Sequence, residues 1–362
     1  GTTQPGWTSN PVVELNGTSA GATADGFTVT GDNSEFRGLA INRFGDDAFN
    51  VDNGASGTVI AGNHIGTDAS GLLDRGNGGS GIDLGTGSGP TLVGGTAAAD
   101  RNLISGNGND GIIIFESDGN TVIGNYIGTD ITGNAPLPNA ADGIALGSTS
   151  SNNVIGQPGW GNVLSGNTND GLELDNDLVG NVIQANVIGL GEDGTSTVAN
   201  GRHGIVLYDG VNNTQVGGTG LGEGNVISGN TESGVVIDAN GIAATTNNTF
   251  EGNYIGTDST GAVGRGNGAY GVHLFNGANG NTIGGAVAGT RNIISGNGTG
   301  EAGVFIDGAA SSDNVIRNNF IGTNAAGNAA IPNNLHGIRM TNAPNTQIIE
   351  NLISGNDVHG VY

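Results

Sequence analysis

A short tetrad, glycine followed by an apolar, a variable and a second apolar residue, recurs along this chain and constrains its fold more than any other feature. The copies are GIDL at Gly81, GIII at Gly111, GIAL at Gly143, GLEL at Gly171, GIVL at Gly204, GVVI at Gly234, GVHL at Gly271, GVFI at Gly303 and GIRM at Gly337. A second short apolar segment follows each tetrad, and a third begins with Asn and continues with x-Ile or x-Leu. Three such segments of period two, separated by Gly and Asn turns, are too brief to pack alone. We therefore expect each repeat of about thirty residues to form one coil of a solenoid and to stack on its neighbours.

The composition agrees with a solenoid. A length of 362 residues alone would suggest two or three globular domains, but the repeat runs almost from end to end and predicts one elongated domain. With 73 Gly and only 4% aromatic residues, a conventional core would be poorly filled, whereas a narrow column of Ile, Val and Leu would not. The chain has 8 Pro and no Gly-X-Y period, which excludes a collagen-like fold.

The charge balance restricts the partners. The chain has no Lys and no Cys, and its 9 Arg face 33 Asp and Glu, so that the net charge of -24 repels nucleic acid and anionic membranes. No apolar run is long enough to span a bilayer, so we expect no membrane insertion. The chain opens at Gly1 rather than at Met, which fits a processed secreted protein or an excised segment. We expect an extracellular or cell-surface protein, and the sequence leaves its oligomeric state open.

The three segments per coil and the Asn-rich corners resemble the bacterial right-handed parallel β-helix repeat proteins, pectate-lyase-like solenoids found in surface or secreted proteins. The resemblance covers residues 25–362 and implies an all-β, right-handed, single-stranded parallel β-helix of about 12 coils, which continues or is capped beyond its C-terminal end. Residues 1–24 are expected to form an N-terminal lead-in or cap. The same fold carries lyases, hydrolases, epimerases, tailspikes and adhesins, so it does not by itself give the function.

Corner Asn residues are predicted to form a ladder, because Asn tolerates a left-handed backbone and stacked amides can hydrogen bond from coil to coil. The ladder members are Asn63, Asn102, Asn125, Asn162, Asn186, Asn225, Asn253, Asn292, Asn319 and Asn351. The repeat is also double, since coils with NYIGTD-like segments alternate with coils with NxISGN segments in a unit of about 60–67 residues. Long loops therefore leave alternating coils at two corners, and we expect each to fold over two layers.

Two groups of Asp residues are candidates for metal ligands. Asp110, Asp142 and Asp170 precede the tetrad glycine on successive coils, where stacked carboxylates repel one another unless a cation or backbone donors hold them. Either calcium binds these three residues or each caps the turn that enters the strand. The Asp of the IGTD segments, as in Asp68 and Asp258, lies too far from its copies to share an ion and is interpreted as a cap of its own turn.

Acidic and aromatic residues gather on the outward face of the tetrad strands. If the apolar tetrad positions point inward, the variable position and the residue after the tetrad point outward. From Gly171 to Gly303 these positions carry Glu173, Asp175, Tyr208, Asp238, His273, Phe275, Phe305 and Asp307, with Asp209 at the edge. We call these nine residues the outward strip. Aromatic rings can pack on apolar sugar surfaces while carboxylates accept hydrogen bonds from sugar hydroxyls, so the strip predicts glycan binding.

Two functions follow from this strip. The leading interpretation is a non-enzymatic stalk or adhesin-like segment of a larger secreted or surface protein, which binds glycan along the strip. The alternative is a polysaccharide hydrolase in which Asp175 and Asp238 form an inverting pair, or Asp209 and Asp238 a retaining pair. A lyase has less support because cations that would neutralise a uronate are scarce on the strip. The Asp-Pro-His-Asp signature of β-helix epimerases is absent, since NNLHG at Asn333 and NDVHG at Asn356 lack the Pro and the second Asp.

Overall fold

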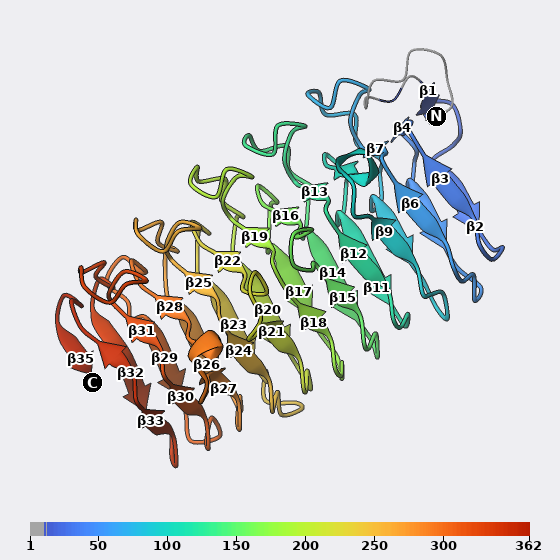
Figure 1. Cartoon of the computed structure of the whole chain (residues 1–362). Coiled ribbons are helices and arrows are strands. Elements are labelled where there is room, and N and C mark those ends of the chain that lie inside the picture. The colour runs from blue at the N-terminus through green and yellow to red at the C-terminus, as the bar shows by residue number, and fades with distance from the viewer. Residues whose placement is uncertain (1–10, 12) are drawn as a thin grey trace.

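The chain is a right-handed parallel β-helix. The computed structural model describes residue 11 and residues 13–362, in which each turn of chain adds one strand to each of three parallel sheets, named A, B and C. Sheets A and B have 12 strands and sheet C has 11, so the predicted fold and the predicted number of coils are confirmed. Crossovers between parallel strands of one sheet are almost always right-handed. Figure 1 shows the coils stacked along one axis from the blue N-terminal end to the red C-terminal end.

The strands are short, and their order along each sheet follows the sequence. Sheet A contains β1 (Val13–Asn16), β4 (Leu39–Asn42), β7 (His64–Ile65), β10 (Leu103–Ile104), β13 (Tyr126–Ile127), β16 (Val163–Leu164), β19 (Val187–Ile188), β22 (Val226–Ile227), β25 (Tyr254–Ile255), β28 (Ile293–Ile294), β31 (Phe320–Ile321) and β34 (Leu352–Ile353). Sheet B contains the tetrad strands β2 (Phe27–Val29), β5 (Phe49–Val51), β8 (Ile82–Leu84), β11 (Ile112–Phe115), β14 (Ile144–Gly147), β17 (Leu172–Leu174), β20 (Ile205–Tyr208), β23 (Val235–Asp238), β26 (Val272–Phe275), β29 (Val304–Asp307), β32 (His336–Thr341) and β35 (His359–Val361). Sheet C contains β3 (Glu35–Arg37), β6 (Val59–Ala61), β9 (Leu92–Gly94), β12 (Thr121–Ile123), β15 (Val154–Ile155), β18 (Val182–Ile183), β21 (Gln215–Gly217), β24 (Thr249–Glu251), β27 (Thr282–Gly284), β30 (Val315–Arg317) and β33 (Gln347–Ile349). Two 3-10 turns, η1 (Ala98–Asp100) and η2 (Ala288–Thr290), lie in loops that enter sheet A.

The main core is one column of mostly branched aliphatic side chains, and Leu103, Tyr126 and Val163 form a smaller cluster apart from it. Each coil contributes inward side chains from its three strands. Three consecutive strands contribute Ile127 from sheet A, Ile144 from sheet B and Ile155 from sheet C, and each of these side chains is fully buried. Burial of one such side chain stabilises the fold by about 1.5–3 kcal/mol, so the column contributes strongly to the cohesion between coils. The described part of the lead-in predicted for residues 1–24 contains β1, which pairs with β4 in sheet A. Residues 1–10 and 12 of that segment lie outside the described residues.

The predicted Asn ladder is present along its whole length. From Asn63 to Asn351, each side-chain amide donates to the carboxamide oxygen of the next member at 2.9 to 3.2 Å. The sequence did not lead us to a second ladder, which runs at another corner with distances of 2.9 to 3.1 Å. Its members are Asn77, Asn107, Asn139, Asn167, Asn200, Asn230, Asn267, Asn297, Asn333 and Asn356. Both ladders fix the vertical register of the coils, because a shift would leave buried amides unpaired.

The tetrad glycine is required by a close approach between coils. None of the nine tetrad glycines has a φ in the left-handed region. A Cβ atom on Gly204 would lie 2.5 Å from Cγ2 of Ile227, 2.6 Å from the carbonyl oxygen of Gly234 and 2.9 Å from the amide nitrogen of Asn230. The other tetrad glycines face equivalent neighbours, including the second ladder. The repeat is therefore set by contacts with the next coil rather than by the backbone conformation of the turn.

The long loops of alternate coils contact one another, as the double repeat predicts. The amide of Ile131 donates to the carbonyl of Gly71 at 3.0 Å, and the amide of Ala325 donates to the carbonyl of Gly261 at 2.9 Å. Within one such loop the carboxylate of Asp258 accepts from the amide of Ala262 at 3.0 Å, which confirms that it caps its own turn. Each loop thus reaches across the intervening coil. Among the described residues, no helix has both the length and the apolar character needed to cross a membrane.

Candidate functional site

The register of sheet B brings the outward strip together on one face. Glu173 lies beside Val206, and the same row continues through Val236, His273 and Phe305. A second row places Tyr208 beside Asp238 and Asp238 beside Phe275. Because Leu174 pairs with Leu207, Asp175 comes into the same row just before Tyr208. Parallel strands without register shifts therefore convert a pattern spread over more than one hundred residues into one continuous surface.

Three acidic side chains meet where the strands of sheet B begin. One oxygen of each of Asp142, Asp170 and Glu173 can be chosen so that all three lie within 4.8 Å of one another, whereas Asp110 is not part of this group. Burial, followed by the neighbouring carboxylates, raises the pKa of Asp142 and of Glu173 to about 7, and burial also raises the pKa of Asp170. Removal from water and mutual repulsion both penalise the charged forms.

Backbone donors partly offset this repulsion. The amide of Asp142 donates to Oδ1 of Asp110 at 2.9 Å, and the amide of Asp170 donates to Oδ1 of Asp142 at 2.7 Å. His203 continues the row, because its amide donates to Oδ1 of Asp170 at 2.6 Å. Each carboxylate therefore caps the equivalent residue of the next coil rather than its own turn. The second oxygen of Asp170 faces Nη1 of Arg202 instead of a backbone amide.

Basic groups lie on one side of the acidic group. Nη1 of Arg202 is 3.5 Å from Oδ2 of Asp170, and Nε2 of His203 is 3.1 Å from a carboxylate oxygen of Glu232. Burial raises the pKa of the Tyr208 phenol, while the charge of Arg202 acts to lower it. Glu232 precedes the tetrad glycine by two residues, and no repeat in the sequence marks that position.

The three candidate catalytic carboxylates lie where the strands of sheet B end. Asp238 is nearly buried and its Oδ1 accepts from the amide of Asn240 at 2.6 Å, while the side chain of Asn240 reaches Oδ2 of Asp209 at 3.4 Å. Oδ1 of Asp175 and Oδ1 of Asp209 are buried and accept no hydrogen bond from the described residues. Burial, followed by the charge of Asp209, raises the pKa of Asp175. Tyr208 lies between Asp175 and Asp238 in the row, so its side chain separates the two carboxylates of the predicted inverting pair.

The aromatic members of the strip pack mainly on one another. The ring of His273 stacks on Phe275 at 4.3 Å between centroids and on Phe305 at 5.0 Å, with interplanar angles of 15° and 11°. The guanidinium carbon of Arg339 lies 4.6 Å from the centroid of the Phe305 ring, and Phe305 is only 7% exposed. Burial lowers the pKa of His273 to about 4, so the imidazole is neutral at pH 7. The rings of His273, Phe275 and Phe305 therefore pack face to face on one another, which the sequence pattern did not indicate.

Buried polar atoms without partners concentrate on this face. Nine buried side-chain polar atoms of the described residues have no hydrogen-bond partner, and four of these are Thr hydroxyls. The other five belong to Asp83, Asp175, Asp209, His273 and His336, which lie on the outward face of sheet B or at its edge. Buried polar groups are nearly always paired, so a concentration of unpaired carboxylate oxygens and imidazole nitrogens needs an explanation. A ligand with hydrogen-bonding groups would supply one.

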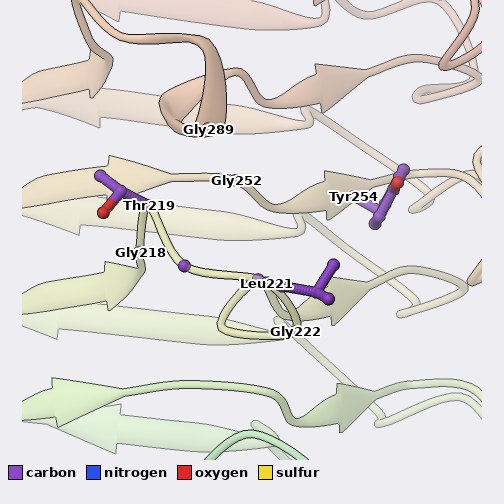
Figure 2. Close-up of a pocket in the computed structure, with 9 residues that line it drawn as sticks. Gly218, Thr219, Leu221, Gly222, Gly252, Tyr254 and Gly289 are labelled. Carbon is purple, nitrogen blue, oxygen red and sulfur yellow. The ribbon is translucent and has the colours of Figure 1, made fainter.

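A hollow on the outside of sheet A lacks the charged and imidazole groups that gather on sheet B. It has a volume of about 390 Å³ and is lined by Thr219, Leu221, Tyr254 and glycines. Figure 2 shows Thr219 and Leu221 on the loop between β21 and β22, with Tyr254 on β25 of the next coil. Its lining offers one Thr hydroxyl and one phenol but no carboxylate, imidazole or guanidinium group. The outward face of sheet B is therefore the better candidate for a functional surface.

Comparison with known proteins gives similarity only among solved structures. No family model matches the chain, and no curated protein matches it in sequence. The A-module of a mannuronan C-5 epimerase from Azotobacter vinelandii has a TM-score of 0.48 and 14% identity over 92% of this chain and 85% of that chain. A periplasmic alginate epimerase gives 0.47 and 14%, over 86% of this chain, which spans only 63% of the epimerase. The catalytic unit of a GH87 α-1,3-glucanase from Streptomyces thermodiastaticus gives 0.43 and 15%, over 91% of this chain and 50% of that one. These values are too low to transfer an activity or a residue role.

Proposed function

We propose that this β-helix binds a polysaccharide along the outward face of sheet B, as a stalk or adhesin-like segment of a larger secreted or cell-surface protein. The observation that carries the proposal is the concentration of unpaired carboxylate oxygens and imidazole nitrogens on that face. Sugar hydroxyls can donate to carboxylates and can donate to or accept from an imidazole, and the side chains of Asp175 and His273 are half-buried rather than fully buried. The coil spacing of about 4.8 Å is close to the advance of one sugar unit in an extended chain, so successive coils can contact successive sugars.

The charge of the chain narrows the class of polysaccharide. A net charge of -24 and an acidic strip oppose the binding of polyanions such as polyuronates and nucleic acids. Tyr208 and Phe275 are the half-exposed rings of the strip and offer the apolar contacts, while Asp175 and Glu173 accept from hydroxyls. We therefore expect a neutral or cationic glycan rather than an acidic one.

Substitution of the half-exposed rings tests this proposal. Tyr208→Ala and Phe275→Ala should each weaken binding to the retained glycan about tenfold, because they remove contact area worth about 1–2 kcal/mol. Affinity electrophoresis through gels that contain each polysaccharide of a broad panel measures the effect. Tyr254→Ala on sheet A removes an equally half-exposed ring and should leave retention unchanged. Equal loss in all three variants, or retention of no polysaccharide by the wild type, contradicts the proposal.

A hydrolase remains the second candidate because of one feature of the strip. Asp175 and Asp209 both have a buried oxygen without a partner, and the charge of Asp209 contributes to the raised pKa of Asp175. Glycoside hydrolysis uses a pair of carboxyl groups with different roles. Release of reducing ends by the wild type, together with Asp209→Asn protein that binds but does not cleave, would favour the hydrolase. Retention of an intact polysaccharide favours the stalk or adhesin-like role.

We further propose that Asp142 and Asp170 bind calcium together with Glu173, with Asp110 supporting the row. Calcium prefers carboxylate oxygens, and binding only to the folded state stabilises by mass action. The proposal rests on the 4.8 Å grouping of the three carboxylates, each of which keeps an oxygen that no backbone amide occupies. Asp110 lies one coil away from this group and contributes through its bond to the amide of Asp142.

The pH dependence of stability gives the test. The pKa values of Asp142 and Glu173 are raised to about 7 in the folded state, whereas the unfolded chain has values of about 4. Their contribution to stability is therefore complete below pH 4 and is lost as the pH rises through 7. With a chelator present, the melting temperature should fall by a few degrees between pH 5 and pH 8, and calcium at pH 8 should restore it.

Asp142→Asn is the matched variant, because its carboxamide oxygen can still accept from the amide of Asp170. We expect a smaller pH effect and a smaller response to calcium than in the wild type. A melting temperature at pH 8 that does not respond to calcium in either protein leaves these residues as structural caps. Asp357→Asn, an exposed change of the same charge, is the control.

A further inference from the structure

A hollow of about 300 Å³ lies on the outward face of sheet B, and one strand, β14, separates it from the outward strip. It is formed by three consecutive strands, β5, β8 and β11, whose register pairs Asn50 with Asp83 and Asp83 with Ile113. Its principal lining residues are Asn50, Asp52, Asp83, Gly85, Ile113 and Phe115. The hollow therefore belongs to the same continuous face but involves none of the nine residues of the outward strip.

Gly85 forms the floor of the hollow, and its backbone does not require glycine. Its φ is not in the left-handed region, and a Cβ atom would come no closer than 3.5 Å to Oδ1 of Asp52 and to the carbonyl of Val51. A side chain would therefore fit without strain. On later coils the equivalent position carries Asp175 or Tyr208, whose side chains fill this space. The absence of a side chain at Gly85 is what opens the hollow.

Phe115 forms one wall and keeps an exposed surface. Its side chain is 40% exposed, which is high for a phenylalanine on a strand. A Cβ atom on Gly147 would lie 3.4 Å from Cδ2 of Phe115. The three atoms nearest to a Cβ atom on Gly85 belong to Asp52 and Val51, and none belongs to Phe115. The ring therefore leans over Gly147 and leaves the space above Gly85 open. It offers an apolar surface at the rim of the hollow.

The opposite wall is acidic and is formed by Asp52 and Asp83. Oδ1 of Asp83 is buried and accepts no hydrogen bond from the described residues. Burial, followed by the charges of Asp52, Asp25 and Asp46, raises the pKa of Asp83 to about 6. All the charges that act on Asp83 in this way are carboxylates, so the potential in the hollow is negative. Such a site favours a cationic group over a neutral one and opposes an anionic one.

We infer that this hollow is a subsite for a sugar unit that carries a free ammonium group, such as a glucosamine residue. The ammonium group would lie between Asp83 and Asp52, a hydroxyl would contact Asn50, and the apolar face of the sugar would pack on Phe115. The choice of a sugar rests on the proposed function of this face. The choice of an amine rests on the charge, the exposed ring and the open floor of the hollow itself.

Isothermal titration with a glucosamine tetramer tests the inference, with the N-acetylglucosamine tetramer as the uncharged analogue. Wild-type protein should bind the amine form about tenfold more tightly than the acetylated form. Gly85→Val fills the floor and Asp83→Asn removes the charge, and each should weaken binding of the amine form about tenfold. Gly31→Val, at an exposed glycine with no atom within 4 Å of its Cβ position, and Asp357→Asn, with the same change in net charge, should bind as wild type does.

The outcomes separate this inference from the proposed function. Unchanged affinity in both Gly85→Val and Asp83→Asn, or equal affinity of wild type for the two tetramers, overturns the subsite. If Tyr208→Ala weakens retention of a polysaccharide in that case, the proposed function stands without the subsite. If Gly85→Val alone fails to fold by circular dichroism, Asp83→Asn still decides, because an Asn at this half-buried position keeps the shape of Asp.

Discussion

Gly204→Ala is expected to destabilise the β-helix by about 3 kcal/mol, at the upper end of the cost of overpacking. The added methyl group would meet Cγ2 of Ile227 at 2.5 Å and the carbonyl oxygen of Gly234 at 2.6 Å. The carbonyl belongs to the backbone of the next coil and cannot move without breaking the pairing of β20 with β23. Urea unfolding followed by far-ultraviolet circular dichroism measures the loss.

Gly31→Ala is the control for that measurement. Gly31 also has a φ outside the left-handed region, but no atom lies within 4 Å of its Cβ position, so its substitution should leave the unfolding midpoint nearly unchanged. The difference between the two unfolding midpoints separates the cost of the close approach between coils from the general preference of turns for glycine. Equal midpoints for Gly204→Ala and wild type would contradict this explanation of the repeat.

Asn186→Ala should have an effect of similar size through a different mechanism. Oδ1 of Asn186 accepts from the amide and the side chain of Asn162, each at 3.0 Å, and its Nδ2 donates to Ile155 at 2.8 Å and Asn225 at 3.0 Å. Alanine leaves these buried groups without partners, which costs about 1–3 kcal/mol for each group that stays unpaired. We expect a total loss of about 3 kcal/mol after local relaxation.

The melting temperature of Asn186→Ala is compared with that of the control variant Asn169→Ala. Asn169 is half-buried at a neighbouring corner, and its side chain makes no hydrogen bond with the described residues. Its replacement should change stability by about 0.5 kcal/mol or less. Similar melting temperatures for the two variants would show that the ladder is not a main source of stability.

The fold could be predicted from the sequence because its determinants are periodic. Inward Ile and Val recur in phase on every coil, and Asn at the start of the third segment recurs with them, so the coils and the first ladder follow directly. The second ladder could not be found in this way, because its Asn belongs to an SGN turn in Asn107 but to the end of a long loop in Asn139. The two contexts look unrelated until the coils are stacked.

The candidate site could be predicted only in part. The period of two correctly places Glu173 and Tyr208 on the outward face, because a strand alternates its side chains. Stacking of His273 on Phe305 depends on side-chain rotamers in two coils, which no sequence pattern specifies. The hollow above Gly85 was also missed, since the preceding coil has Ala48 in place of the tetrad glycine and does not match the repeat.

The most direct test of glycan binding on sheet B is a crystal structure with bound oligosaccharide. Crystals should be soaked with short fragments of whichever polysaccharide the gel panel retains. We predict density for sugar units along the outward face of sheet B, in contact with Tyr208 and Phe275 and within hydrogen-bond distance of Asp175. Density confined to the glycine-lined hollow on sheet A (Figure 2), or sugar bound only away from sheet B, would contradict the account.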